Sequence, residues 1–144
     1  MTDTRPQGVF VSPSAERAII FANGLLADPA AARATIRPAD LLIAADGGLH
    51  HLQALGLRPH VLIGDFDSIG PEEARQMAAD GVRVARFSPR KDQTDLELAL
   101  RLAISEGAGD ILIFGALGAR WDHTLANLRR LAHPDFQAAR LRLV

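Results

Sequence analysis

Four short runs of uniformly apolar residues, at positions 18–22, 41–45, 61–63 and 111–114, constrain the fold more than any other feature of this chain. Apolar runs of this length, without polar alternation, are typical of strands that are buried on both faces of a parallel sheet. The stretches between these runs carry apolar residues at the spacing typical of helices. This alternation predicts βαβ units with right-handed crossovers. We therefore expect an α/β fold: a doubly wound, mostly parallel sheet with helices on both faces, in three α/β/α layers.

The stretches between the runs contain recognisable helix starts and stops. Residues 25–36 are rich in alanine, and Asp28 and Pro29 suit an N-cap and a first helical position. Residues 82–87 alternate between apolar and polar, which predicts a strand exposed on one side, near an edge of the sheet. Further helices are predicted at residues 49–55, 71–80, 94–106 and 121–133, and a last strand at residues 139–144.

The size and composition of the chain bound its class. Its 144 residues suffice for one compact domain; we expect a flexible arm at residues 1–16 and a single α/β domain at residues 17–144. A net charge of −1 argues against a nucleic-acid-binding surface. The absence of cysteine excludes disulfides, thiolate zinc sites and cysteine nucleophiles. No apolar run approaches the roughly 20 residues of a membrane span, and no signal-peptide pattern is present, so we expect a cytoplasmic protein.

Two carboxylates follow the third apolar run directly. Asp65 and Asp67 are two residues apart, so in an extended backbone their side chains point the same way. Two such carboxylates repel each other unless a cation lies between them. Oxygen ligands at the end of a strand suit a hard cation such as Mg²⁺. The alternative is a polar turn with two solvated aspartates.

Polar residues also follow the other predicted strands. In a doubly wound sheet the ligand site lies beyond the carboxyl ends of the strands, so these residues should converge on one crevice. Carboxylates for Mg²⁺, Arg and Lys for phosphate oxygens, and glycines for close backbone approach together predict a phosphate and metal site. The residues in question are Asp46, Gly47 and Gly48; Arg90, Lys91, Asp92, Thr94 and Asp95; and Gly115, Gly118, Arg120, Asp122 and His123.

Several of these residues also have a purely structural interpretation. Thr94 and Glu97 match a capping box, Asp95 suits a first helical turn, and Asp122 suits an N-cap. The histidines at positions 50, 51, 60 and 133 are interpreted as structural or solvated. The chain has neither a G-x-x-x-x-G-K-[ST] loop nor a G-x-G-x-x-G fingerprint. A nucleotide enzyme of this sequence would therefore hold phosphates mainly through a metal and side chains.

Four segments, taken together and in order, resemble the thiamin pyrophosphokinase (thiamin diphosphokinase) family over residues from about 19 to the end. They are A-D-G-G at 45–48, G-D-F-D-S-I at 64–69, K-D-Q-T-D at 91–95 and G-A-L-G-A-R-W-D-H at 115–123. The resemblance implies an enzyme that moves the terminal diphosphate of ATP onto the hydroxyl of thiamin, giving thiamin diphosphate and AMP. ATP would be the co-substrate and Mg²⁺ the cofactor.

The resemblance also assigns roles to residues. Asp65, Asp67 and Asp95 match magnesium-binding and catalytic acids, and Asp46 matches an acid in the same cleft. Lys91, Asp92 and Thr94 match the loop beside the nucleotide phosphates. Arg120 and Asp122 match a segment that lines the substrate cleft. Either Asp46 or Asp92 could accept the hydroxyl proton, and the sequence does not choose between them.

The resemblance has one departure. Members of the family carry a second, all-β domain that helps form the thiamin pocket in a homodimer, and we expect this chain to lack it. Two other functions therefore remain open: a nucleotide-binding or assembly module without turnover, and a haloacid-dehalogenase-like phosphatase with Asp65 as its nucleophile. The phosphatase motif belongs on a first strand, whereas two predicted strands precede Asp65.

Overall fold

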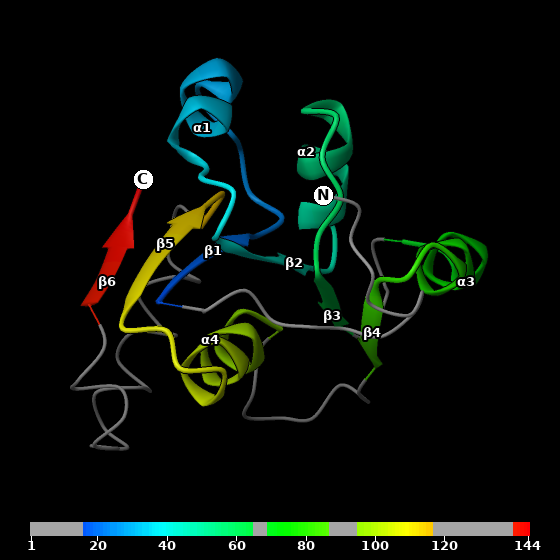
Figure 1. Cartoon of the computed structure of the whole chain (residues 1–144). Coiled ribbons are helices and arrows are strands. Elements are labelled where there is room, and N and C mark those ends of the chain that lie inside the picture. Colours follow the sequence, from blue (N-terminus) through cyan, green and yellow to red (C-terminus); the bar gives the residue numbers. More distant parts are fainter. Residues whose placement is uncertain (1–15, 65–68, 87–94, 117–139) are drawn as a thin grey trace, which may run out of the picture.

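The computed structural model of the chain describes residues 16–64, 69–86, 95–116 and 140–144. Strands and helices alternate along most of this part (Figure 1). The strands are β1 Arg17–Phe21, β2 Leu41–Ala45, β3 Val61–Gly64, β4 Arg83–Arg86, β5 Asp110–Phe114 and β6 Arg140–Leu143. The helices are α1 Pro29–Thr35, α2 Gly48–Ala54, α3 Pro71–Ala79 and α4 Asp95–Ser105. The predicted helix at residues 121–133 lies outside the described residues.

The six strands form one sheet in the order β4-β3-β2-β1-β5-β6, and each neighbouring pair is parallel. From β1 the chain adds β2, β3 and β4 on one side, and it then returns to place β5 on the other side of β1. This reversal puts a topological switch point between β1 and β5. The predicted α/β fold is confirmed, and β4 is indeed an edge strand of the sheet.

Two apolar layers cover the two faces of the sheet. On one face α4 packs through Leu96, Leu100 and alanines against residues such as Ile20. On the other face lie α1, α2 and α3, packed against residues such as Phe21. Figure 1 shows α1 and α2 on the side of the sheet opposite α4. The four residues 18–21 of β1 alternate between the two layers and are fully buried. The uniformly apolar runs therefore reflect strands with protein on both sides, as predicted.

Local sequence explains where most helices begin and end. The side chain of Asp28 accepts a hydrogen bond from the backbone N–H of Ala31, and Pro29 occupies the first helical position. Within the predicted range 25–36, the helix occupies Pro29–Thr35, and the predicted N-cap and first helical residue are confirmed. Gly56 follows α2 with a φ of 75°, a left-handed conformation that suits glycine. None of the described helices is long and apolar enough to span a membrane.

Candidate functional site

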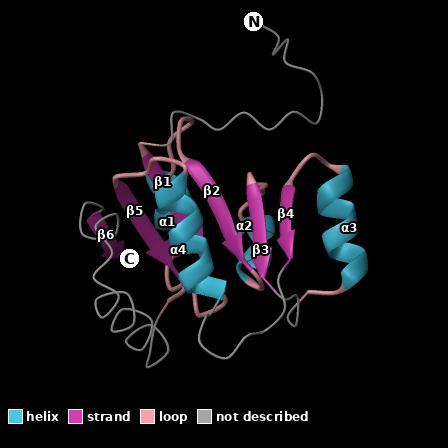
Figure 2. Ribbon diagram, turned by 90° about the horizontal axis from the view of Figure 1, so that it is seen from below, coloured by secondary structure: helices cyan, strands magenta, loops and turns pink. Residues whose placement is uncertain are grey.

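The candidate site lies at the carboxyl edge of the sheet, where the strands run into their connecting loops. Figure 2 shows the arrowheads of β2, β3 and β4 at one edge. The described segments at this edge are residues 22–28 after β1, residues 46–47 after β2 and residues 115–116 after β5. α4 connects the carboxyl end of β4 to the amino end of β5, so its first residue, Asp95, also lies at this edge. The topology thus brings Asp46 and Asp95 to the same edge.

Asp46 is a buried carboxylate at this edge. It is 4% exposed, and its backbone N–H donates to the carbonyl oxygen of Ile63 over 2.8 Å. Its φ of 48° makes it the one non-glycine residue with a positive φ among those the structure describes. A left-handed aspartate costs some backbone energy, and such residues cluster at functional sites. The strain and burial together favour a functional role for Asp46 over a plain turn.

The carboxylate of Asp46 lies against the end of β3. A Cβ built on Gly64 would lie 3.1 Å from the Oδ2 atom of Asp46. Asp65 follows Gly64 directly in the sequence, so the backbone that leads to the predicted metal ligands starts beside the Asp46 carboxylate. A side chain at position 64 would crowd this carboxylate. The glycine that ends β3 thus allows the two strand ends to approach each other closely.

The loops after β1 and β5 meet backbone to backbone. The N–H of Gly24 donates to the carbonyl oxygen of Gly115 over 2.7 Å, and the N–H of Ala22 donates to that of Phe114 over 2.8 Å. A Cβ at Gly24 would lie only 2.2 Å from the oxygen of Gly115. Gly115 has a φ of 77°, which also favours glycine. This contact joins the two loops at the switch point, which is where doubly wound sheets bind their ligands.

Most of the predicted site residues lie outside the described residues. These are Asp65, Asp67, Lys91, Asp92, Thr94, Arg120 and Asp122. Asp95 is described through its backbone only, as the first residue of α4. Within the described ranges, no group of three or more histidine, aspartate or glutamate side chains is placed to hold a metal ion. The predicted metal and phosphate ligands therefore stay predictions.

The histidines in the described part each make a specific contact. The Nε2 atom of His51 lies 2.5 Å from the carbonyl oxygen of Gly24, and that of His50 lies 3.1 Å from Oε1 of Glu73. The Nδ1 atom of His60 accepts from the N–H of Leu42 over 2.9 Å. Sequence reasoning missed the contact of His51 with the switch point. Only the position of the Asn-Gly turn after the first strand could have pointed to it.

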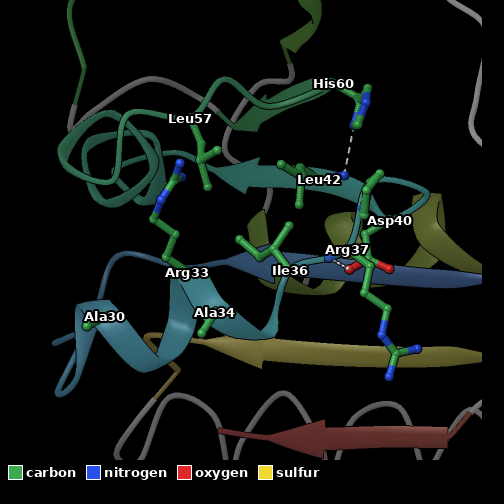
Figure 3. Close-up of a pocket in the computed structure, with 10 residues that line it drawn as sticks. Ala30, Arg33, Ala34, Ile36, Arg37, Asp40, Leu42, Leu57 and His60 are labelled. Atoms are coloured by element: carbon green, nitrogen blue, oxygen red, sulfur yellow. Dashed lines mark hydrogen bonds between the residues drawn. The ribbon is translucent and has the colours of Figure 1, made fainter.

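A separate cavity of about 720 Å³ opens at the opposite, amino edge of the sheet (Figure 3). It lies between the α1–β2 and α2–β3 connections, and Ile36, Leu42 and Leu57 provide apolar walls. Two of its polar groups hold the fold together: a guanidinium nitrogen of Arg33 donates to the carbonyl oxygen of Leu55, and Asp40 binds Arg17. This cavity is remote from the carboxyl edge, and we assign it no part in the candidate site.

Comparison with known proteins gives a consistent set of relatives. Residues 32–143 match the family model described as thiamin pyrophosphokinase, catalytic domain. A thiamine pyrophosphokinase of Bacillus subtilis is 40% identical over 91 residues, which are 63% of this chain and 42% of the relative. Thiamine pyrophosphokinase 1 of rice is 34% identical over 80 residues, 51% of this chain and 30% of the relative.

Solved structures agree with these sequence matches. The structure of a thiamine pyrophosphokinase from Bacillus subtilis superposes with a TM-score of 0.67 and 33% identity, covering 89% of this chain and 59% of that one. A thiamin pyrophosphokinase from Geobacillus thermodenitrificans gives a TM-score of 0.67 and 30% identity over the same shares. This chain thus spans less than two thirds of these relatives.

Proposed function

Since this chain belongs to the thiamin pyrophosphokinase family, whose catalytic-domain model it matches over residues 32–143, we propose that it transfers the terminal diphosphate of ATP to the hydroxyl of thiamin. The products are thiamin diphosphate and AMP. The family match is the observation that carries the proposal. The buried, left-handed Asp46 at the carboxyl edge supports it, because this is where such a sheet would hold a nucleotide.

The proposed metal ligands are Asp65, Asp67 and Asp95. A set made of carboxylates suits Mg²⁺, which prefers oxygen ligands and phosphate partners. Bound there, Mg²⁺ would neutralise charge on the phosphate oxygens. Gly64, which directly precedes the first of these acids in the sequence, lies against the Asp46 carboxylate, and this supports the proposal that the acid acts at the carboxyl edge.

The remaining site residues have proposed roles in positioning and charge. Lys91 and Thr94 would bind phosphate oxygens by charge and hydrogen bonds, and Arg120 and Asp122 would line the substrate cleft. Asp46 or Asp92 would accept the proton of the thiamin hydroxyl. Phosphoryl-type transfer depends mostly on such positioning and charge neutralisation, so few groups need to take part in bond making.

Asp46 offers a direct test, because it is the acid whose surroundings the structure describes. The Asp46→Asn variant removes the charge while retaining a residue that tolerates a left-handed backbone. We expect it to reduce AMP and thiamin diphosphate formation about a hundredfold or more. Asp80→Asn is a matched control, since Asp80 lies at the end of α3 and near the amino edge. Equal activity of both variants would contradict a role for Asp46.

The same assay separates the alternatives. Magnesium-dependent binding of a non-hydrolysable ATP analogue without any AMP formation would indicate a nucleotide-binding or assembly module. A phosphoenzyme trapped on Asp65 would indicate the phosphatase, which the family match does not favour. A homodimer as the active form and a cytoplasmic location remain part of the proposal; analytical ultracentrifugation tests the dimer.

A further inference from the structure

His51 joins α2 to the loop after β1, although sequence reasoning assigns it no function. Its Nε2 atom lies 2.5 Å from the carbonyl oxygen of Gly24, and the ring is half-buried. A carbonyl oxygen can only accept a hydrogen bond, so Nε2 carries the proton and donates it. The helix that follows Asp46 is thereby tied to the end of the first strand.

Gly24 extends this connection to a second loop. Its carbonyl oxygen accepts from His51, while its own N–H donates to the carbonyl oxygen of Gly115 over 2.7 Å. The contact is tight, because a Cβ at Gly24 would lie 2.2 Å from the same oxygen. A shift of Gly24 therefore moves the loop after β5 as well. Residues 115–123, which carry Arg120 and Asp122, begin at that loop.

We propose that His51 is a positioning residue for the nucleotide. Through Gly24 it holds the loops after β1 and β5 at the spacing that binding at the switch point between them requires. The inference rests on the proposed function, because it takes the ligand to be Mg·ATP. The His51 ring touches no substrate in this proposal and acts only through the backbone of Gly24.

The neighbouring histidine provides a matched control. His50 lies on the same helix, and its Nε2 atom is 3.1 Å from Oε1 of Glu73 on α3. The two residues share their type, their helix and one hydrogen bond each. They differ in burial, since His50 is exposed and His51 half-buried, and only the His51 bond reaches the switch point. Loss of a hydrogen-bonded histidine from this helix would affect both variants, whereas a positioning role affects one; the ring of His51→Phe controls for the burial.

The experiment compares His51→Leu, His51→Phe, His51→Gln and His50→Leu in the full chain. Calorimetry measures the affinity for a non-hydrolysable ATP analogue with Mg²⁺. Losing one hydrogen bond should weaken binding about three- to tenfold in the Leu and Phe variants. Glutamine presents an amide nitrogen as donor and should restore affinity to within about twofold of wild type. His50→Leu should bind as wild type does.

Hydrogen exchange of the Gly24 amide gives a readout that needs no ligand. Removing the His51 donor should accelerate exchange of this amide, which is bonded to Gly115, and His50→Leu should leave it unchanged. His51→Phe keeps a ring of similar size, so it carries the test if His51→Leu does not fold.

Four results would overturn the inference. Wild-type affinity in both His51→Leu and His51→Phe would remove the positioning role while leaving the proposed function intact. An equal loss in His50→Leu, or no recovery in His51→Gln, would show a general packing effect instead. A wild-type chain that binds no analogue would overturn the proposed function, and this inference with it.

Discussion

Replacing Asp40 tests what holds the amino edge of the sheet together. Asp40 is 3% exposed and lies directly before β2. Its carboxylate accepts from Nε and Nη2 of Arg17 over 2.9 and 2.6 Å, and from the backbone N–H of Arg37 over 2.7 Å. Arg17 also donates to the carbonyl oxygen of Thr35 over 2.6 Å. One ion pair thus joins the starts of β1 and β2 to the end of α1.

The expected cost follows from the burial of both partners. The hydrogen bond to Asp40 raises the pKa of Arg17, against the opposing effect of burial, so the guanidinium stays charged. Asp40→Ala would leave this cation, only 11% exposed, without its carboxylate. Removing one partner of a buried pair typically costs about 3–5 kcal/mol. For a domain of this size, that loss lowers the unfolding temperature by about 10–20 °C.

Urea denaturation followed by circular dichroism measures the loss. Asp80→Ala serves as control, since the Asp80 carboxylate lies 4.0 Å from Arg58 in a pair that is largely exposed. An exposed pair of this kind contributes at most about 1 kcal/mol. A loss below about 1 kcal/mol in Asp40→Ala, equal to that of the control, would refute the reasoning. High salt should weaken the control pair and leave the buried pair nearly unchanged.

Three further predictions concern single residues. Burial lowers the pKa of His60 below its usual 6.5, so the ring in the folded protein resists a proton that the unfolded chain accepts. The free energy of unfolding should therefore stay constant above about pH 6.5 and decrease as the pH falls below that value. His60→Asn, which keeps an acceptor for the N–H of Leu42, should flatten this dependence in urea titrations at several pH values. Asp46→Gly should relieve the strain of the left-handed backbone, so the variant should be as stable as the wild type or up to about 1 kcal/mol more stable. Asp46→Ala should lower the stability, and thermal unfolding compares the two variants. Gly48→Ala would place a Cβ 1.8 Å from the carbonyl oxygen of Phe21, so it should cost about 1–3 kcal/mol or more, and wild-type stability would contradict the described contact.

The sequence predicted the elements well where burial alone determines them. The runs at 18–22 and 41–45 became β1 and β2 because protein covers both faces of the sheet at those positions. The alternation at 82–87 predicted an edge strand, since β4 has a neighbour on one side only. Within the alanine-rich range 25–36, the predicted N-cap Asp28 and first helical residue Pro29 are confirmed, because a capping side chain and a proline mark a helix start more sharply than alanine content does.

Contacts between distant residues could not be read from the sequence. His51 lies 27 positions after Gly24, and Arg17 lies 23 positions before Asp40. Neither pair has a local pattern, because each contact depends on the order of strands in the sheet. The left-handed Asp46 likewise makes a contact between two strand ends, because its N–H donates to the carbonyl oxygen of Ile63 on β3. Sequence patterns thus predicted that acidic residues come directly after the strands. The structure adds the hydrogen bonds that join the described loops to one another.

The strand order also has a consequence for how the chain folds as it is synthesised. In the sheet, β1 pairs with β2 on one edge and with β5 on the other, where Arg17 lies opposite Asp110, so the partner of the second edge is synthesised much later than that of the first. Until β5 emerges, β1 is a nascent edge strand with exposed apolar side chains and unpaired backbone groups. Such edge strands can pair with other chains, so we expect the partly synthesised chain to be prone to aggregation until β5 pairs with β1. Slowing translation before residue 110 would lengthen this interval and increase the demand for chaperones.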